Sequence, residues 1–234
     1  MIAVFKRELK SYLSSPVGYS YLFIFLLATG FFFWANNITA NSTDTIGYFA
    51  YTRYLLIVII PLLAMKLFPE ERKNKTDQIL ITAPISIPQM VMGKFLAAYT
   101  MFVIGLIPTF INMIFLASVG YLEIGIAAGN YIGLLFIAAA FLAIAMLMSV
   151  LTKSMITAFI MGAFSLALFA VADLVAQSLN ITVLSKIVSV VSVTSRYEQF
   201  NQGLFNISTI IYFLSLAVIF IFLTIRVIDK RRWS

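Results

Sequence analysis

Six long apolar stretches alternate with short polar segments along the chain. Each is close to the roughly 20 residues that a helix needs to cross the hydrocarbon core of a bilayer. Two of them contain a proline, Pro61 and Pro108, where a kink in the helix is expected. The pattern predicts six transmembrane helices, at residues 17–34, 48–68, 95–119, 127–151, 155–174 and 207–227.

The first fifteen residues are too polar to span a membrane, but their apolar side chains recur at helical spacing. Lys6, Arg7 and Lys10 fall mostly on the rest of the helix surface. This pattern is typical of a helix that lies along the inner membrane surface, and Ser14-Ser15-Pro16 is expected to end it. The alternative is a basic flank that only orients the first span. The apolar positions are Ile2, Phe5, Leu9, Tyr12 and Leu13.

A charged segment, EERKNKTDQILITAPIS at residues 70–86, separates the second and third spans. Six ionisable residues come first, and a short apolar run then ends at Pro84. Thr76 can cap a short helix over residues 77–82, and Pro84 disfavours helix at the residue before it. Ser86 is expected to cap the next helix, with Pro88 in its first turn. The product is an apolar-faced helix that can dock in a groove of a cytoplasmic partner; the alternative is a charged loop that only fixes topology.

Composition restricts the class of protein. Hydrophobic residues make up 62% of the 234 positions, the mean hydropathy is +1.02, and only 11% of residues are charged. A soluble domain of this size needs more polar surface, so the fold class expected is an all-α integral membrane protein with a single domain over residues 1–234. Cysteine and histidine are both absent. Disulfides, Cys/His metal sites, imidazole chemistry and cysteine nucleophiles are therefore excluded.

The net charge of +7 is distributed unevenly along the chain. Thirteen of the sixteen Lys and Arg residues fall in segments on one side of a six-span topology, leaving Arg53, Lys186 and Arg196 on the other. The positive-inside rule makes the first side cytoplasmic, with both termini. The charge is thus a topology signal and not a nucleic-acid footprint.

Ionisable groups are expected to be missing from the span interiors. Arg53 and Lys66 lie near the ends of the second span, where long side chains can extend to the headgroups. Ion-coupled carriers need such groups at depth to bind the coupling ion. The sequence also has no P-loop and no intramembrane protease motif, so energy for uphill transport must come from a partner.

Four segments resemble one family, the permeases of type-2 ABC exporters. They are FKRELKSYLSSPVGY at the start, ERKNKTDQILITAPIS in the charged segment, SVTSRYEQFNQGLF before the last span and FLTIRVIDKRRW at the end. The branch that they resemble most contains gliding-motility and nitrous-oxide-reductase accessory permeases. One departure is Lys75, where the family pattern has glycine.

The resemblance implies a non-catalytic membrane subunit, with no cofactor of its own. Two such permeases, identical or related, would assemble with cytoplasmic ABC ATPase subunits that bind ATP and Mg, and an accessory extracytoplasmic membrane protein is a further expected partner. Residues 1–15 would be the interfacial helix, 69–94 the cytoplasmic loop with the coupling helix, and 175–206 an outer segment with short re-entrant helices. The location implied is a prokaryotic plasma membrane.

The residues implied by this resemblance fall into three groups. Those expected to contact the ATPase are Glu71, Arg72, Thr76, Asp77, Gln78, Ile79, Leu80, Thr82 and Pro84. Those of the interfacial helix are Phe5, Arg7, Glu8, Leu9 and Tyr12. Those nominated for a substrate route or permease interface are Phe31, Phe32, Phe33, Ile59, Leu63, Phe164 and Phe169, although each could equally face lipid or the core.

Three functions are compatible with these features. The leading prediction is the permease subunit of an ATP-driven exporter. The second is a membrane anchor or mechanotransmitting module that uses ATPase motion without moving a solute. The third, an ion-coupled carrier, is disfavoured by the expected lack of charge within the spans.

Overall fold

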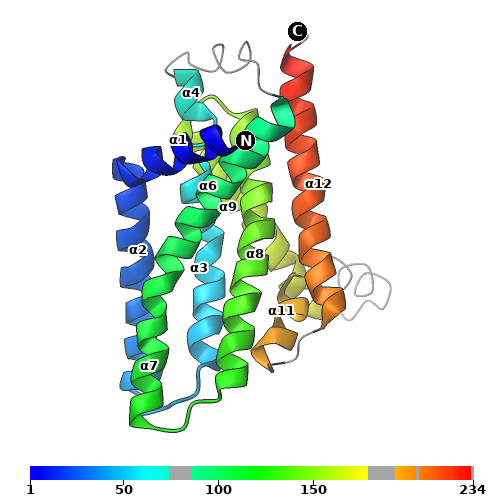
Figure 1. The fold of residues 1–234 in the computed structure, drawn as a ribbon. Helices are drawn as coiled ribbons and strands as arrows, with labels where there is room; N and C mark the ends of the chain where they lie inside the picture. Colours follow the sequence, from blue (N-terminus) through cyan, green and yellow to red (C-terminus); the bar gives the residue numbers. More distant parts are fainter. Residues whose placement is uncertain (74–85, 179–192, 204–205, 233–234) are drawn as a thin grey trace.

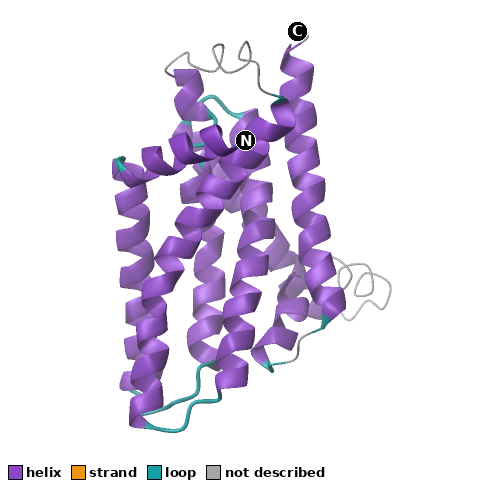
Figure 2. Cartoon of the chain, viewed as in Figure 1, coloured by secondary structure: helices purple, strands orange, loops and turns teal. Residues whose placement is uncertain are grey.

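A computed structural model of the chain describes residues 1–73, 86–178, 193–203 and 206–232. In these residues the fold is a bundle of long helices with no strand, as Figure 2 shows. The helices that run along the bundle are α2 (Pro16–Phe33), α3 (Ile46–Ala64), α6 (Ile87–Leu106), α7 (Phe110–Val119), α8 (Ile124–Leu151), α9 (Met155–Ser178) and α12 (Ile207–Arg232). Shorter elements are α1 (Ile2–Leu13), α4 (Pro69–Lys73) and α11 (Val193–Asn201).

Five helical segments of the described residues are long and apolar enough to cross a membrane. They are Pro16–Ile38, Ile46–Lys73, Ile87–Val119, Ile124–Leu151 and Ile207–Lys230. The first includes a π-helical turn, η1 (Trp34–Ile38), and the third includes a 3₁₀ segment, η2 (Ile107–Thr109), that contains Pro108. The fifth predicted span, residues 155–174, falls on α9, whose apolar part is the shorter stretch Met155–Ala170.

Helix α8 is the centre of the bundle. It packs against α12, α9, α3, α11 and α6, and most of its residues are buried. Its middle is rich in alanine, which lets neighbouring backbones approach closely in an apolar environment. Only residues 152–154 separate the end of α8 from the start of α9, and the two helices pack against each other as an antiparallel pair.

Both termini lie at one end of the bundle, together with α1 and α4 (Figure 1). We call this end the N/C end. Helix α1 lies across it, at a steep angle to α2, and a sharp turn joins the two helices. Ser15 caps α2 by accepting a hydrogen bond from the Gly18 N–H, and a Cβ on Gly18 would lie 2.0 Å from the Tyr12 carbonyl oxygen. The turn therefore requires glycine at this position.

Candidate functional site

Four charged side chains meet at the N/C end, where α1, α4 and α6 come together. We call Arg7, Glu8, Glu71 and Lys94 the ion cluster. Lys94 is fully buried, and its Nζ lies 3.2 Å from Glu8 Oε1 and 2.8 Å from Glu71 Oε1. The same ammonium donates a hydrogen bond of 2.7 Å to the carbonyl oxygen of Leu67. Lys94 therefore joins α6 to α1, to α4 and to the turn that precedes α4.

Arg7 completes the cluster on its more exposed side. Its Nη2 lies 2.5 Å from Glu8 Oε1 and 2.7 Å from Glu71 Oε1. Two cations and two carboxylates make the cluster neutral, and this pairing offsets part of the cost of removing the charges from water. Burial alone would raise the pKa of the Glu8 carboxyl, but the Lys94 ammonium and the Arg7 guanidinium lower that pKa below its ordinary value. Glu8 is therefore ionised at neutral pH.

The local sequence explains why α1 reaches Lys94. Val4, Glu8 and Tyr12 recur one helical turn apart and are the buried residues of α1. Gly93 of α6 lies against Val4, and a Cβ there would lie only 3.0 Å from the Val4 Cβ. The missing side chain lets α1 approach α6, and this approach places the Glu8 carboxylate beside Lys94.

Lys66 makes a second connection to α1. Its Nζ donates a hydrogen bond of 2.9 Å to the Ser11 carbonyl oxygen, lies 3.6 Å from Glu70 Oε2, and sits 5.2 Å from the centre of the Tyr12 ring. The Tyr12 hydroxyl in turn donates to the Leu63 carbonyl oxygen at 2.7 Å. The prediction that Lys66 extends to the headgroups is wrong, because its side chain is buried among protein groups.

Arg72 connects α4 to the C-terminal end of α8. Its guanidinium donates hydrogen bonds of 2.6 Å to the Val150 carbonyl oxygen and 2.5 Å to the Thr152 carbonyl oxygen. These carbonyls lie at the C-terminal end of α8. The carbonyl oxygens of the last turn of a helix have no N–H donor within the helix, so they need partners from elsewhere. A cation there also complements the negative end of the helix dipole. The base of the loop between α3 and α6 is thus held by α1, α6 and α8.

The predicted ATPase contacts divide into two sets. Glu71 and Arg72 are described, and the contacts given above are with the chain itself. The other predicted contacts lie outside the described residues: Thr76, Asp77, Gln78, Ile79, Leu80, Thr82 and Pro84. The structure therefore describes the base of the predicted coupling loop and not its tip. Ser86 occupies the N-cap position of α6 and Pro88 lies in the first turn, as predicted, but the Ser86 side chain makes no capping hydrogen bond.

The residues of the predicted interfacial helix lie on different sides of α1. Glu8 and Tyr12 are buried against the chain, Phe5 and Leu9 are partly buried, and Arg7 is half-exposed in the ion cluster. The periodicity of apolar residues had grouped Tyr12 with the membrane side. Tyr12 instead lies on the buried side of α1. Its hydroxyl donates a hydrogen bond to the Leu63 carbonyl oxygen there, and a buried tyrosine hydroxyl needs such a partner.

The nominated route residues do not form one surface in this chain. Phe31 on α2 and Phe164 on α9 are 56% and 64% exposed. Phe32 and Phe169 are partly buried, whereas Phe33, Ile59 and Leu63 are buried in the core. Phe33 packs edge-on against the rings of Tyr48 and Phe115.

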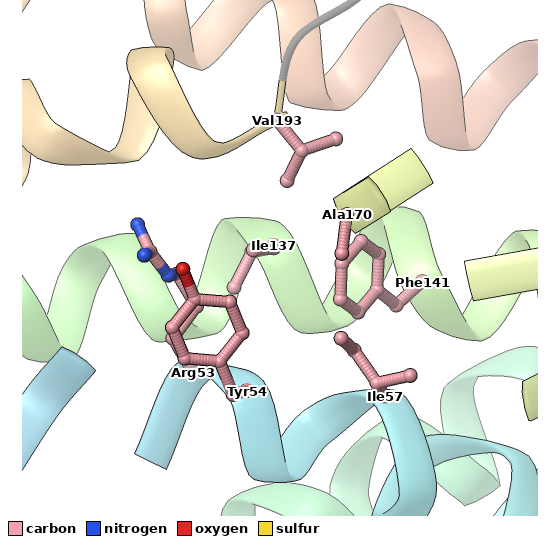
Figure 3. A pocket seen from close by; sticks show the side chains of 7 residues that line it. All are labelled: Arg53, Tyr54, Ile57, Ile137, Phe141, Ala170 and Val193. Atoms are coloured by element: carbon pink, nitrogen blue, oxygen red, sulfur yellow. The ribbon is translucent and has the colours of Figure 1, made fainter. Parts of the chain in front are cut away.

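A second charged site lies toward the opposite end, in a pocket between α3, α8, α9 and α11 (Figure 3). The Arg53 guanidinium lies 4.8 Å from the Tyr54 ring centre and 5.0 Å from that of Tyr197, and the Arg53 side chain is buried. Cations stack favourably on such rings when water is excluded. Ile57, Ile137, Phe141, Ala170 and Val193 complete the lining.

Arg53 and Lys94 are charged residues within the candidate spans Ile46–Lys73 and Ile87–Val119. Arg53 lies well inside α3 and Lys94 well inside α6, and both side chains are buried. Sequence reasoning placed Lys94 in the loop before the third span. The signal that could have corrected this is the helix start at Ser86-Ile87-Pro88, which puts Gly93 and Lys94 inside the helix. Among the described residues, no group of three or more acidic side chains could hold a metal ion.

Comparison with known proteins adds one finding. A family model described as "ABC-2 family transporter protein" matches residues 8–233, nearly the whole chain. A search of curated proteins found no significant match.

Proposed function

The chain belongs to the ABC-2 family of transporter proteins, and from this premise we propose that it is the permease subunit of an ATP-driven exporter. Family membership implies a multi-pass membrane component that associates with an ABC ATPase subunit. Export is the proposed direction, and transmission of ATPase motion through the ion cluster is the proposed mechanism. The branch proposed is that of the gliding-motility and nitrous-oxide-reductase accessory permeases.

The observation that carries the mechanism is the anchoring of the loop base. Residues 74–85, which contain the predicted coupling helix, lie between α4 and α6. Glu71 joins α4 to Lys94 of α6 and Arg7 of α1, while Arg72 joins it to the end of α8. A displacement of the loop by an ATPase would therefore act on three helices at once. Because α4 is bonded to these helices, motion of the loop would move them. A loop connected to the bundle only by its two chain ends could move without displacing the helices.

We propose six crossings with both termini in the cytoplasm. The apolar part of α9 would supply the sixth crossing beside the five longer helices. The two chain ends lie at the same end of the bundle, which is compatible with an even number of crossings (Figure 1). The described basic residues Lys6, Lys10, Arg72 and Lys73 belong to α1 and α4 at this end, as the positive-inside rule requires of a cytoplasmic side.

A second permease subunit would complete the assembly, and an accessory extracytoplasmic protein would join it. The exposed rings of Phe31 and Phe164 are available for a contact between subunits. The buried Phe33, Ile59 and Leu63 would support that surface from the chain's own core. ATP and Mg would bind to the ATPase subunits, and the membrane would be a prokaryotic plasma membrane.

The test is a substitution in the predicted coupling helix. Replacing Leu80 with Asp would bury an unpaired carboxylate in the apolar groove of the ATPase, which costs several kcal/mol. We expect the Leu80→Asp permease to insert in the membrane normally but to copurify with the ATPase at least about 100-fold less, since each 1.4 kcal/mol is tenfold in affinity. Asn74→Asp adds the same charge in the same loop and should leave copurification unchanged. Full association of the Leu80→Asp permease would refute the proposed docking.

A further inference from the structure

Helix α1 has an apolar edge that the chain does not cover. Ile2 and Leu13 are 65% and 43% exposed, and Phe5 and Leu9 next to them are only partly buried. Val4, Glu8 and Tyr12 occupy the neighbouring side and are buried. The helix thus has one face against its own protein and an apolar edge that projects from it.

A pair of lysines borders this edge. Lys6 and Lys10 are one helical turn apart and exposed, and they follow Ile2 and Leu13 around the helix. Arg7, the third basic residue of α1, is different, because Glu8 and Glu71 already pair with it. Lys6 and Lys10 therefore present two positive charges directly beside exposed hydrocarbon.

The position of α1 next to the first candidate span indicates which part of the bilayer its apolar edge faces. Helix α2, the first candidate span, begins at Pro16, so only Ser14 and Ser15 separate it from α1. Because α1 lies across the N/C end at a steep angle to α2, it runs where a bilayer that surrounds α2 would have its headgroups (Figure 1). An apolar edge bordered by lysines matches the interfacial region, with acyl chains on one side and phosphates beside them.

We propose that α1 is a binding site for anionic phospholipid headgroups of the inner leaflet. Ile2 and Leu13 enter the acyl region, and Lys6 and Lys10 bind the lipid phosphates. The inference rests on the orientation given in the proposed function. It adds a ligand class, and it connects that ligand to the ion cluster, because the neighbouring side of the same helix carries Glu8 against Lys94. Charge complementarity selects an anionic lipid over a zwitterionic one, since each basic residue near the surface gains from net negative charge.

The experiment uses the full-length permease alone in vesicles of mixed phosphatidylcholine and phosphatidylglycerol. The chain has no cysteine, so Leu13→Cys carries a single fluorophore at the apolar edge. Quenching by brominated phosphatidylglycerol is compared with quenching by brominated phosphatidylcholine in the same mixture. We expect preferential quenching by phosphatidylglycerol, weakened by salt. Lys6→Gln and Lys10→Gln should each lower this preference about fivefold, which corresponds to about 1 kcal/mol per basic residue near an anionic surface.

Lys153→Gln is the matched control, because it removes an exposed lysine from the connection between α8 and α9 and should leave the preference unchanged. Equal quenching by the two lipids, or a preference that survives loss of both lysines, would overturn the proposal. A fluorophore that no brominated lipid quenches would also overturn it, because the edge would then face protein. No ATPase is present, so failure of this assay is separate from failure of Leu80→Asp to release the ATPase.

Discussion

Lys94 is the residue on which the ion cluster depends. Its ammonium has no contact with water and is neutralised by Glu8 and Glu71, which come from different helices. Removing one partner of a buried ion pair leaves the other charge without compensation, and this usually costs more than the pair contributes. Removing a single charge of the cluster should therefore destabilise the protein more than removing all four charges together.

Lys94→Met is expected to destabilise the permease by about 3–5 kcal/mol, the usual cost of breaking a buried ion pair. The physical reason is that Glu8 and Glu71 lose the buried one of the two cations that contact them both, and only Arg7 remains. Thermal unfolding in detergent measures the effect. The double variant Lys94→Met with Glu71→Gln should recover part of the loss, because one carboxylate is then removed as well. A Lys94→Met protein as stable as wild type would show that the cluster does not hold the helices together.

Arg72 is expected to act through its two hydrogen bonds to the end of α8 and not through charge alone. Arg72→Lys keeps the charge but cannot reproduce the planar fork that reaches both Val150 and Thr152. We expect it to lower stability by about 1.5–3 kcal/mol, the usual range for hydrogen bonds to charged groups. Lys73→Gln is the control, because Lys73 is the next residue and its side chain is exposed. If the two variants unfold at the same temperature, the α4–α8 connection is not structural.

Helix α11 packs on α8 through glycines of α8 that are spaced four residues apart. A Cβ on Gly129 would lie 2.8 Å from the Phe200 carbonyl oxygen, and one on Gly133 would lie 2.9 Å from the Tyr197 ring. The Tyr197 hydroxyl also donates to Asn130 Oδ1 at 3.1 Å. Small residues at one helix face are the usual way in which helices approach closely in membranes.

Gly129→Ala is expected to displace α11, because the added methyl group meets backbone, which cannot rotate away. The expected cost is about 1–3 kcal/mol, as for other overpacked sites. Gly125→Ala on the same helix is the control, since its Cβ would meet nothing within 4 Å. Thermal unfolding and labelling of a cysteine introduced at the exposed Gln202 report stability and the position of α11. Equal behaviour of the two alanine variants would contradict close packing at Gly129.

Helix positions were predictable because the signals are local. The predicted span at residues 17–34 corresponds to α2, which begins at Pro16 behind the Ser15 cap, and continues into η1. The predicted span 127–151 ends with α8 at Leu151. Pro108, where a kink is expected, lies in the 3₁₀ segment η2 between α6 and α7. In each case a cap, a proline or the end of an apolar run marks the chain at the position concerned.

The surroundings of the charged residues could not be predicted in the same way. Glu8 and Lys94 are 86 positions apart, and only the packing of α1 on α6 brings them together. Arg72 and Val150 are 78 positions apart. A lysine near the end of an apolar run has the same local sequence whether it reaches the headgroups or a buried carboxylate. Periodicity on α1 predicted the helix but misplaced Tyr12 for a related reason, since the buried face contains Glu8 as well as Val4 and Tyr12.

The buried charges of the described residues lie in two separate regions of the molecule. The ion cluster, Lys66 and Arg72 lie at the N/C end, where they join α1, α4, α6 and α8. Arg53 lies with Tyr54 and Tyr197 in the pocket that α11 helps to line. Helix α8 contributes to both regions, and α3 lines the pocket and accepts the Tyr12 hydrogen bond at Leu63, so these two helices are the elements through which a displacement at the loop would reach the opposite end.

The orientation of the bundle gives the last prediction. If the N/C end is cytoplasmic, a cysteine at residue 74, directly after α4, must be protected from an impermeant thiol reagent added to intact cells. A cysteine replacing Asn201 at the end of α11 must be labelled, because α11 lies near the opposite end of α8 (Figure 1). The chain has no cysteine of its own, so each labelled band reports one position. Permeabilised cells provide the control, since residue 74 should then react as well. Labelling of residue 74 from outside, with residue 201 protected, would invert the topology and place the ion cluster beyond the reach of a cytoplasmic ATPase.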